Sequence, residues 1–359
     1  MVSAALVAAA FGLALPRVTS YRSVWASAHA MTWPHTLLIA IAAAASMTSY
    51  WIAIRAVLPS LRLRQAAVVN LGSNAVANTM PAGGALAMGV SWAMLSSWGL
   101  STADYVLYTL VAGVWNVFAL LGLPVLALLV MTTAGPPGAG LITAAVVGLV
   151  LLAALATGLC LLLRSQAFAL RAGRVLQRPV AFTARLARRP SPANTAGALA
   201  SFRDRAGALL AARGWRITAA TVASNLALWL VLLACLRGLG LSQAQVPWQV
   251  SLAAFAFIRL LTALPLTPGG LGITELGLVS ILAVGAGHEV SAQVTAAVLL
   301  YRALTYLPPI PLGALACLVW RHAPRLVATR PGGHKAQPAE LPGVALRAVE
   351  IRTDFRSPG

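Results

Sequence analysis

Long apolar runs separated by short polar or basic segments set the pattern of the whole chain. Residues 105–131, 141–163 and 217–236 are continuous apolar stretches, and each matches the roughly 20 residues that cross a bilayer core as a helix. A helix satisfies its own backbone hydrogen bonds in lipid, so each run predicts a membrane helix. The pattern predicts two further helices, over residues 35–57 and 294–320.

Two other apolar segments are interrupted in their middle by proline and glycine. Residues 66–98 are broken at 80–84, and residues 250–286 are broken at 265–270. Non-helical backbone at membrane depth is tolerated only inside protein or beside water, so each segment is predicted to be a pair of half-helices that either re-enters or crosses. The breaks supply the candidate site residues Pro81, Gly83, Gly84, Pro268, Gly269 and Gly270.

The interrupted segments stand at corresponding places in two halves of the chain. Residues 1–163 are expected to form one membrane half, 164–215 an Arg-rich linker, 216–320 the second half, and 321–359 a disordered polar tail. The predicted fold is an all-α polytopic membrane protein with about six crossings and two broken pairs in an inverted repeat. Such paired interruptions point to a transporter's midplane site, although two unrelated kinked helices would give the same pattern. Whether residues 1–16 form a full first helix stays open.

Composition excludes a soluble protein and argues against a nucleic-acid partner. Hydrophobic residues make up 59% of the chain and charged residues 9%, against about 25% charged in soluble domains. The net charge of +19 is concentrated beside membrane segments, since eleven Arg lie between Arg164 and Arg216 and another basic group follows Arg321. This is the positive-inside pattern, which predicts a multi-pass plasma membrane protein with the linker and tail in the cytoplasm.

The Arg-rich linker has a second possible role at the membrane surface. Arg171, Arg174 and Arg178 would share one helical face with apolar residues interleaved, a pattern typical of helices that lie on an anionic leaflet. Topology alone also accounts for arginine here. Both interpretations stay open.

Glu275 is the only carboxylate well inside an apolar stretch. An intramembrane charge costs about 3 kcal/mol on translocon scales, so we expect a partner, and Arg259 and Arg302 are the candidates. The three groups together carry a net charge of +1 and lie beside a half-helix N-terminus, which suits a phosphate better than a cation. The alternative is that Glu275 caps its helix and pairs with one arginine for structure alone.

Asparagine is the second polar signal in the membrane segments. Asn70, Asn74 and Asn78 recur every four residues, which places them on one face of the first half-helix. Asn116 lies on another predicted helix. Amides bind a lipid headgroup without the cost of a charge, but they also join helices by hydrogen bonds. The sequence leaves both roles open.

No catalytic or metal-binding constellation stands out. The three cysteines, Cys160, Cys235 and Cys317, are far apart, the five histidines are scattered, and Gly83-Gly84 is not followed by a phosphate-binding Gly-Lys-Ser. We therefore expect no metal, no cofactor, no nucleotide hydrolysis and no enzymatic activity.

A family resemblance rests on three runs near the C-terminal break: Pro265-Leu-Thr-Pro-Gly-Gly-Leu-Gly-Ile-Thr-Glu275, Leu299-Leu-Tyr-Arg-Ala-Leu-Thr-Tyr306 and Pro311-Leu-Gly313. They resemble the flippase-like membrane domain of the lysylphosphatidylglycerol synthase family, together with its archaeal dolichol-pathway relatives, over nearly the whole chain to about Arg321. The first break departs from this pattern. Relatives often carry Gly-Glu and then Arg just after it, whereas this chain has Gly84-Ala85 and Met88.

The resemblance implies a protein that moves lipids between leaflets. Its lipid would be anionic, aminoacylated or polyprenyl-linked. From the residues themselves we expect the lipid to bind around Glu275, Arg302, Arg259 and the asparagines, and, because no phosphate-binding loop is found, to move without a nucleotide. The alternative is a membrane scaffold that presents a lipid-linked substrate to a separate transferase, and a weaker one is an unrecognised membrane enzyme. The 39 residues from Arg321 to Gly359 are not expected to hold the synthase domain that aminoacylates a lipid.

Overall fold

The computed structural model describes residues 31–80, 83–132, 139–165, 171, 195–263 and 270–322. Within these ranges the protein is all-helical and has no strand, which confirms the predicted fold class. Five helical segments in the described chain are long and apolar enough to cross a membrane. Residues 1–16, which the prediction of about six crossings includes, lie outside the described residues.

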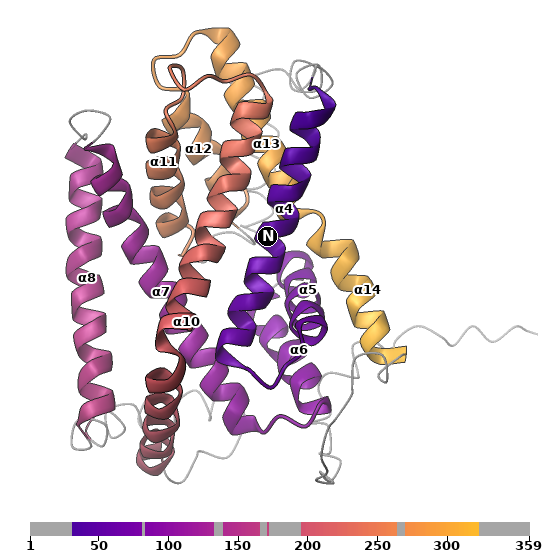
Figure 1. Ribbon diagram of the computed structural model, residues 1–359, viewed down its shortest axis with the longest axis vertical. Helices are drawn as coiled ribbons and strands as arrows, with labels where there is room; N and C mark the ends of the chain where they lie inside the picture. The colour runs from indigo at the N-terminus through magenta and orange to yellow at the C-terminus, as the bar shows by residue number, and fades with distance from the viewer. Residues whose placement is uncertain are drawn as a thin grey trace, which may run out of the picture.

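The helices form an elongated bundle whose longest members run along the vertical of Figure 1. Helices α4 and α10 pack together at its centre, α8 packs against α7 on one side, and α14 packs against α5 on the other. The elements are α4 (Trp33–Val57), α5 (Leu63–Thr79), α6 (Gly83–Ser97), α7 (Thr102–Met131), α8 (Ala139–Arg164), α10 (Thr195–Gly238), α11 (Trp248–Leu261), α12 (Ile273–Leu282), α13 (His288–Tyr306) and α14 (Pro309–His322).

Both interrupted segments are pairs of separate helices, as predicted. α5 ends at Thr79 because the next residue, Met80, is extended (φ −102°, ψ 143°), the conformation that a following proline favours. Gly83 then begins α6 so close to α5 that an added Cβ would collide with the Val76 and Ala77 carbonyls. In the second pair α11 packs against α12. Pro81, Pro268 and Gly269 lie outside the described residues.

The C-terminal helix differs from the prediction. A continuous helix over residues 294–320 was expected, but the chain forms α13 and α14 with an interruption at Leu307 and Pro308. Proline lacks the N–H that a helix interior needs, and its ring clashes with the carbonyl four residues before it. Tyr306 at the end of α13 and Pro309 at the start of α14 line the same cavity.

The first helix after the linker is longer than expected. The apolar run that predicts it begins at residue 217, whereas α10 begins at Thr195 and has 44 residues, about 66 Å of helix. Its N-terminal part is alanine-rich, a composition that favours helix. The Arg203 Nε donates a hydrogen bond to the Leu163 carbonyl at 3.0 Å, and the Arg205 guanidinium lies 3.6 Å from the Asp104 carboxylate. These contacts tie the extension to α8 and α7.

Gly313 lets α14 approach α5 closely, and we expect Gly313→Ala to destabilise the protein. A Cβ at this position would collide with the Leu71 carbonyl oxygen and the Ala75 methyl group, so the helices must shift, at a cost of about 1 to 3 kcal/mol. Thermal unfolding in detergent measures the loss. Gly122→Ala on α7 is the matched control, since an added Cβ there meets nothing within 4 Å. Equal melting temperatures for the two variants would contradict this account of the contact.

Candidate functional site

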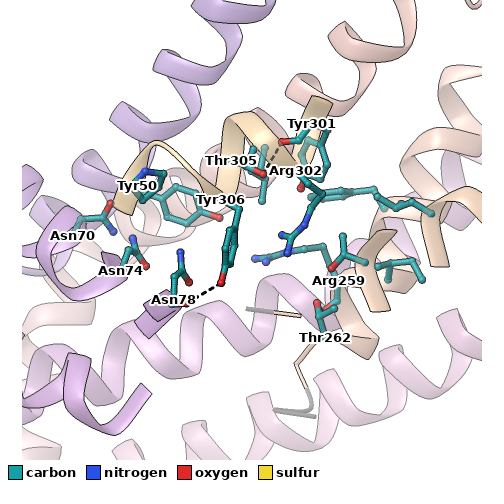
Figure 2. A pocket seen from close by; sticks show the side chains of 16 residues that line it. Tyr50, Asn70, Asn74, Asn78, Arg259, Thr262, Tyr301, Arg302, Thr305 and Tyr306 are labelled. Carbon is teal, nitrogen blue, oxygen red and sulfur yellow. Dashed lines mark hydrogen bonds between the residues drawn. The ribbon is translucent and has the colours of Figure 1, made fainter. Parts of the chain in front are cut away.

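A polar cavity of about 350 Å³ lies where the interrupted helices end. Its wall is built from one face of α5, the C-terminal halves of α11 and α13, the N-terminal part of α12 and the start of α14, with one residue each from the C-terminal parts of α4 and α10. Figure 2 shows the side chains of this wall pointing into a common space. The polar groups that concern function are Tyr50, Asn70, Asn74, Asn78, Arg259, Thr262, Arg302 and Tyr306.

Arg302 on α13 is held by Glu275 on α12. The Arg302 Nε lies 2.6 Å from the Glu275 Oε1, which confirms the predicted pairing, and the Gly272 backbone N–H donates to the Glu275 Oε2 at 2.6 Å. The carboxylate therefore caps α12 and neutralises one arginine at once. The Arg302 guanidinium also stacks over the Tyr306 ring, 5.1 Å from its centroid.

Glu275 lies behind the cavity wall, so the prediction that it lines the cavity with the two arginines is wrong. Its side chain is 1% exposed, and the described residues that form the wall include Arg259 and Arg302 but not Glu275. The physical reason is that both carboxylate oxygens are used, one by the helix cap and one by Arg302. Its alternative structural role, cap and partner, is what the geometry shows.

Arg259 on α11 has a different environment. Its Nη2 donates to the Asn225 Oδ1 on α10 at 3.2 Å, and its Nε is buried without a hydrogen-bond partner in the described chain. In the part of the chain that the structure describes, no carboxylate lies in salt-bridge contact with it. Figure 2 shows the Arg259 and Arg302 side chains reaching into the same part of the cavity from opposite helices. The cavity thus carries more positive than negative charge.

The three asparagines of α5 line the opposite side of the cavity, on one helix face as predicted. Within the described residues none of their carboxamides hydrogen-bonds to protein. The link between α13 and α5 uses the backbone instead, since the Tyr306 hydroxyl donates to the Asn78 carbonyl at 2.9 Å. Asn225 is the asparagine that joins helices, because its Oδ1 on α10 accepts a hydrogen bond from Arg259 on α11. Its amide nitrogen donates to the Thr221 carbonyl within α10. Three amides therefore face the cavity with donors and acceptors unused.

The remaining predicted site residues lie elsewhere. Asn116 is exposed on α7 and is not part of the cavity wall. Gly83 serves the tight turn between α5 and α6, Gly84 is exposed, and Gly270 has φ +69° and packs against Thr262 and Thr274. Of the linker arginines, Arg174 and Arg178 lie outside the described residues.

Several residues of the cavity wall were not among the predicted site residues. Tyr306 follows Arg302 by four positions and Thr262 follows Arg259 by three, so helical spacing from the arginines would have indicated both. Tyr50, on α4, has no such signal. Its place on the wall depends on how α4 packs in three dimensions.

The family model of the lysylphosphatidylglycerol synthase TM region matches residues 1–313. The chain belongs to this family. The matched range contains both interrupted helix pairs and every residue of the cavity wall, so the site is built from the part of the chain that the lysylphosphatidylglycerol synthase TM region defines. No curated protein shows a significant match to the chain. Family membership and the apolar helices together establish a multi-pass membrane protein.

Proposed function

We propose that this member of the lysylphosphatidylglycerol synthase TM family binds the headgroup of an anionic lipid in the cavity and carries it between leaflets without a nucleotide. The observation that carries the proposal is the polar, arginine-lined cavity at the meeting point of broken helices. Discontinuous helices that meet around polar groups are how secondary transporters build a substrate site inside the membrane. The proposal includes no catalytic step and no cofactor.

The packing of the helices supports an inverted repeat with re-entrant pairs. α5 and α6 lie in the lower half of Figure 1, whereas α11 and α12 lie in the upper half. α5 packs against α14 and α11 packs against α7, while α4 packs against α10. In an inverted repeat, α4 would correspond to α10, α5 to α11, and α7 to the pair α13–α14. This correspondence converts the contact between α5 and α14 into the contact between α11 and α7, and it keeps the contact between α4 and α10. Two halves related in this way would expose the cavity alternately to the two faces.

The distribution of arginine supports a plasma membrane protein whose lower end in Figure 1 faces the cytoplasm. α4, α8 and α14 end, and α10 begins, toward that end. The basic residues at or near these termini are Arg55, Arg62, Arg64, Arg164, Arg203, Arg205 and Arg321. Positive charge beside cytoplasmic helix ends is the general rule and favours contact with anionic lipids there.

Cysteine labelling tests this orientation. In a variant without Cys160, Cys235 and Cys317, we expect an impermeant maleimide on intact cells to label Gln243→Cys, in the exposed α10–α11 connection, and not Ser60→Cys, in the exposed α4–α5 connection. Permeabilised cells, in which both sites react, provide the control. Labelling of Ser60→Cys alone in intact cells would invert the orientation.

Leaflet exchange in nucleotide-free liposomes tests the function itself. We expect vesicles that contain the protein to exchange fluorescent phosphatidylglycerol between leaflets faster than protein-free vesicles. The alternative, a scaffold that presents a lipid-linked substrate to a separate transferase, needs a cavity open to one face only. It predicts lipid binding without exchange, and that outcome would refute the translocase proposal.

A further inference from the structure

The charge around the cavity is one-sided. Of the seven acidic residues in the chain, Glu275 alone lies beside the cavity in the described structure, and both of its oxygens are used. Residues 81–82 and 264–269, which connect the broken helices, contain no acidic residue. A cationic ligand group entering the cavity would therefore meet two guanidinium groups and no available carboxylate.

Arg259 is the side chain whose positive charge an anionic ligand would neutralise and whose unused N–H donor it would bind. Burying a charge is costly unless it is paired, yet the Arg259 Nε has no partner in the described chain, and its recorded hydrogen bond goes to the neutral amide of Asn225. A guanidinium presents a planar fork of donors that matches a phosphate. Glu275 already neutralises Arg302, so the two arginines and the glutamate carry a net charge of +1. This charge is balanced by the single negative charge of one phosphodiester.

The amide side of the cavity suits a different part of the ligand. A carboxamide both donates and accepts hydrogen bonds without carrying charge, which fits hydroxyl groups. Asn70, Asn74 and Asn78 present three such amides in a row, across the cavity from the arginines. A volume of about 350 Å³ is at the small end of ligand sites, which span roughly 300 to 1,000 Å³. It accommodates a phosphate with one small hydroxylated group.

We infer that the cavity selects a lipid with one phosphodiester linked to an uncharged, hydroxyl-bearing headgroup, such as a glycerol or a single sugar, and discriminates against aminoacylated lipids. The inference rests on the proposed function, because it assigns the lipid class of that same site. Phosphatidylglycerol and a polyprenyl-phosphate monosaccharide share the required chemistry. Lysyl-phosphatidylglycerol adds ammonium groups that the cavity cannot neutralise.

Native mass spectrometry of the purified full chain with mixed lipids tests the inference. The probes are phosphatidylglycerol, lysyl-phosphatidylglycerol, a polyprenyl-phosphate hexose, and phosphatidylmethanol, which has the same charge as phosphatidylglycerol but no hydroxyls. We expect the affinity for phosphatidylglycerol and for the polyprenyl-phosphate hexose to be about tenfold higher than the affinity for lysyl-phosphatidylglycerol. One charge-assisted contact accounts for a difference of this size. Free glycerol phosphate at equal concentration is expected not to displace them. Displacement would identify a soluble phosphate as the ligand and overturn the lipid assignment.

Matched variants separate the two sides of the cavity. Arg259→Gln is expected to lower phosphatidylglycerol binding about 10- to 100-fold, and Asn74→Leu is expected to abolish the preference for phosphatidylglycerol over phosphatidylmethanol. Arg216→Gln and Asn116→Leu, exposed positions outside the cavity, are expected to match the wild type. The inference would be overturned if the wild type bound lysyl-phosphatidylglycerol as tightly as phosphatidylglycerol. It would also be overturned if the cavity variants kept the wild-type melting temperature and the wild-type order of lipid affinities.

The binding experiment does not measure transport, so the two proposals fail separately. If the protein exchanges lipid between leaflets but shows no headgroup preference, the inference is refuted and the proposed function still stands. A preserved preference without exchange would refute the translocase and leave the headgroup assignment.

Discussion

Replacing Glu275 by glutamine is expected to lower the free energy of unfolding by about 3 kcal/mol, since breaking a buried ion pair strands its partner. Glu275 is 1% exposed and the Arg302 side chain 14% exposed, so water cannot take over the lost contact. Glutamine retains one acceptor oxygen, but that oxygen cannot serve both the Gly272 N–H and the Arg302 Nε. The start of α12 and the end of α13 would loosen together. Thermal and denaturant unfolding in detergent measure the change.

The control for Glu275→Gln is Glu289→Gln at the exposed start of α13, which should melt like the wild type. The double variant Glu275→Gln/Arg302→Gln should be more stable than Glu275→Gln alone, because it removes the stranded charge as well. If Glu275→Gln melts like Glu289→Gln, the ion pair does not hold this part of the fold. Loss of lipid exchange with unchanged stability would instead favour a direct transport role for Glu275.

Arg259→Gln is expected to have the opposite effect: the free energy of unfolding should be nearly unchanged, whereas the affinity for lipid should fall. The substitution loses one hydrogen bond, from the charged Arg259 guanidinium to Asn225, worth about 1.5 to 3 kcal/mol. This loss is offset because the substitution also removes a buried charge that has no carboxylate partner in the described structure. Stability should therefore change by no more than about 1 kcal/mol in either direction. Lipid binding should fall about 10- to 100-fold, because a hydrogen bond to a charged group is worth about 1.5 to 3 kcal/mol.

Arg259→Lys separates charge from geometry at the same position. Lysine restores the positive charge but not the planar fork, so we expect it to recover part of the binding that Arg259→Gln loses. Phosphatidylglycerol affinity and melting temperature are measured side by side for both variants. Full binding by Arg259→Gln would remove this arginine from the site, and a protein too unstable to purify would show that the buried guanidinium is structural.

The helices were predictable because lipid constrains them strongly. Each backbone group in a bilayer must be paired within its own segment, so a long apolar run leaves little choice but a helix. The apolar run 105–131 was expected to form one helix, and α7 covers Thr102–Met131. The helix expected at 35–57 is α4, Trp33–Val57. The break at Leu307 and Pro308 was overlooked because proline scarcely lowers the hydropathy of an apolar run. It is the covalent geometry of proline that interrupts the helix.

The candidate site was predictable only in part. The cost of a buried charge indicated a partner for Glu275, but the choice of Arg302 over Arg259 depends on where α11 and α13 lie relative to α12. That relation is tertiary, as is the place of Tyr50 on the wall. Asn116 entered the prediction as an amide within a predicted membrane helix, and the structure places it on the outer surface of α7. Spacing along the chain fixes a helix face only relative to its own helix.

Leaflet exchange measured in identical nucleotide-free liposomes for the wild type, Arg259→Gln and Arg216→Gln tests the central claim most directly. The two variants lose the same charge, one on the cavity wall and one on the exposed part of α10. We predict that the wild type and Arg216→Gln exchange phosphatidylglycerol at similar rates, and that Arg259→Gln falls at least about tenfold toward the protein-free rate. Equal exchange by all three proteins, or exchange by none above protein-free vesicles, would contradict the cavity as a path for lipid headgroups.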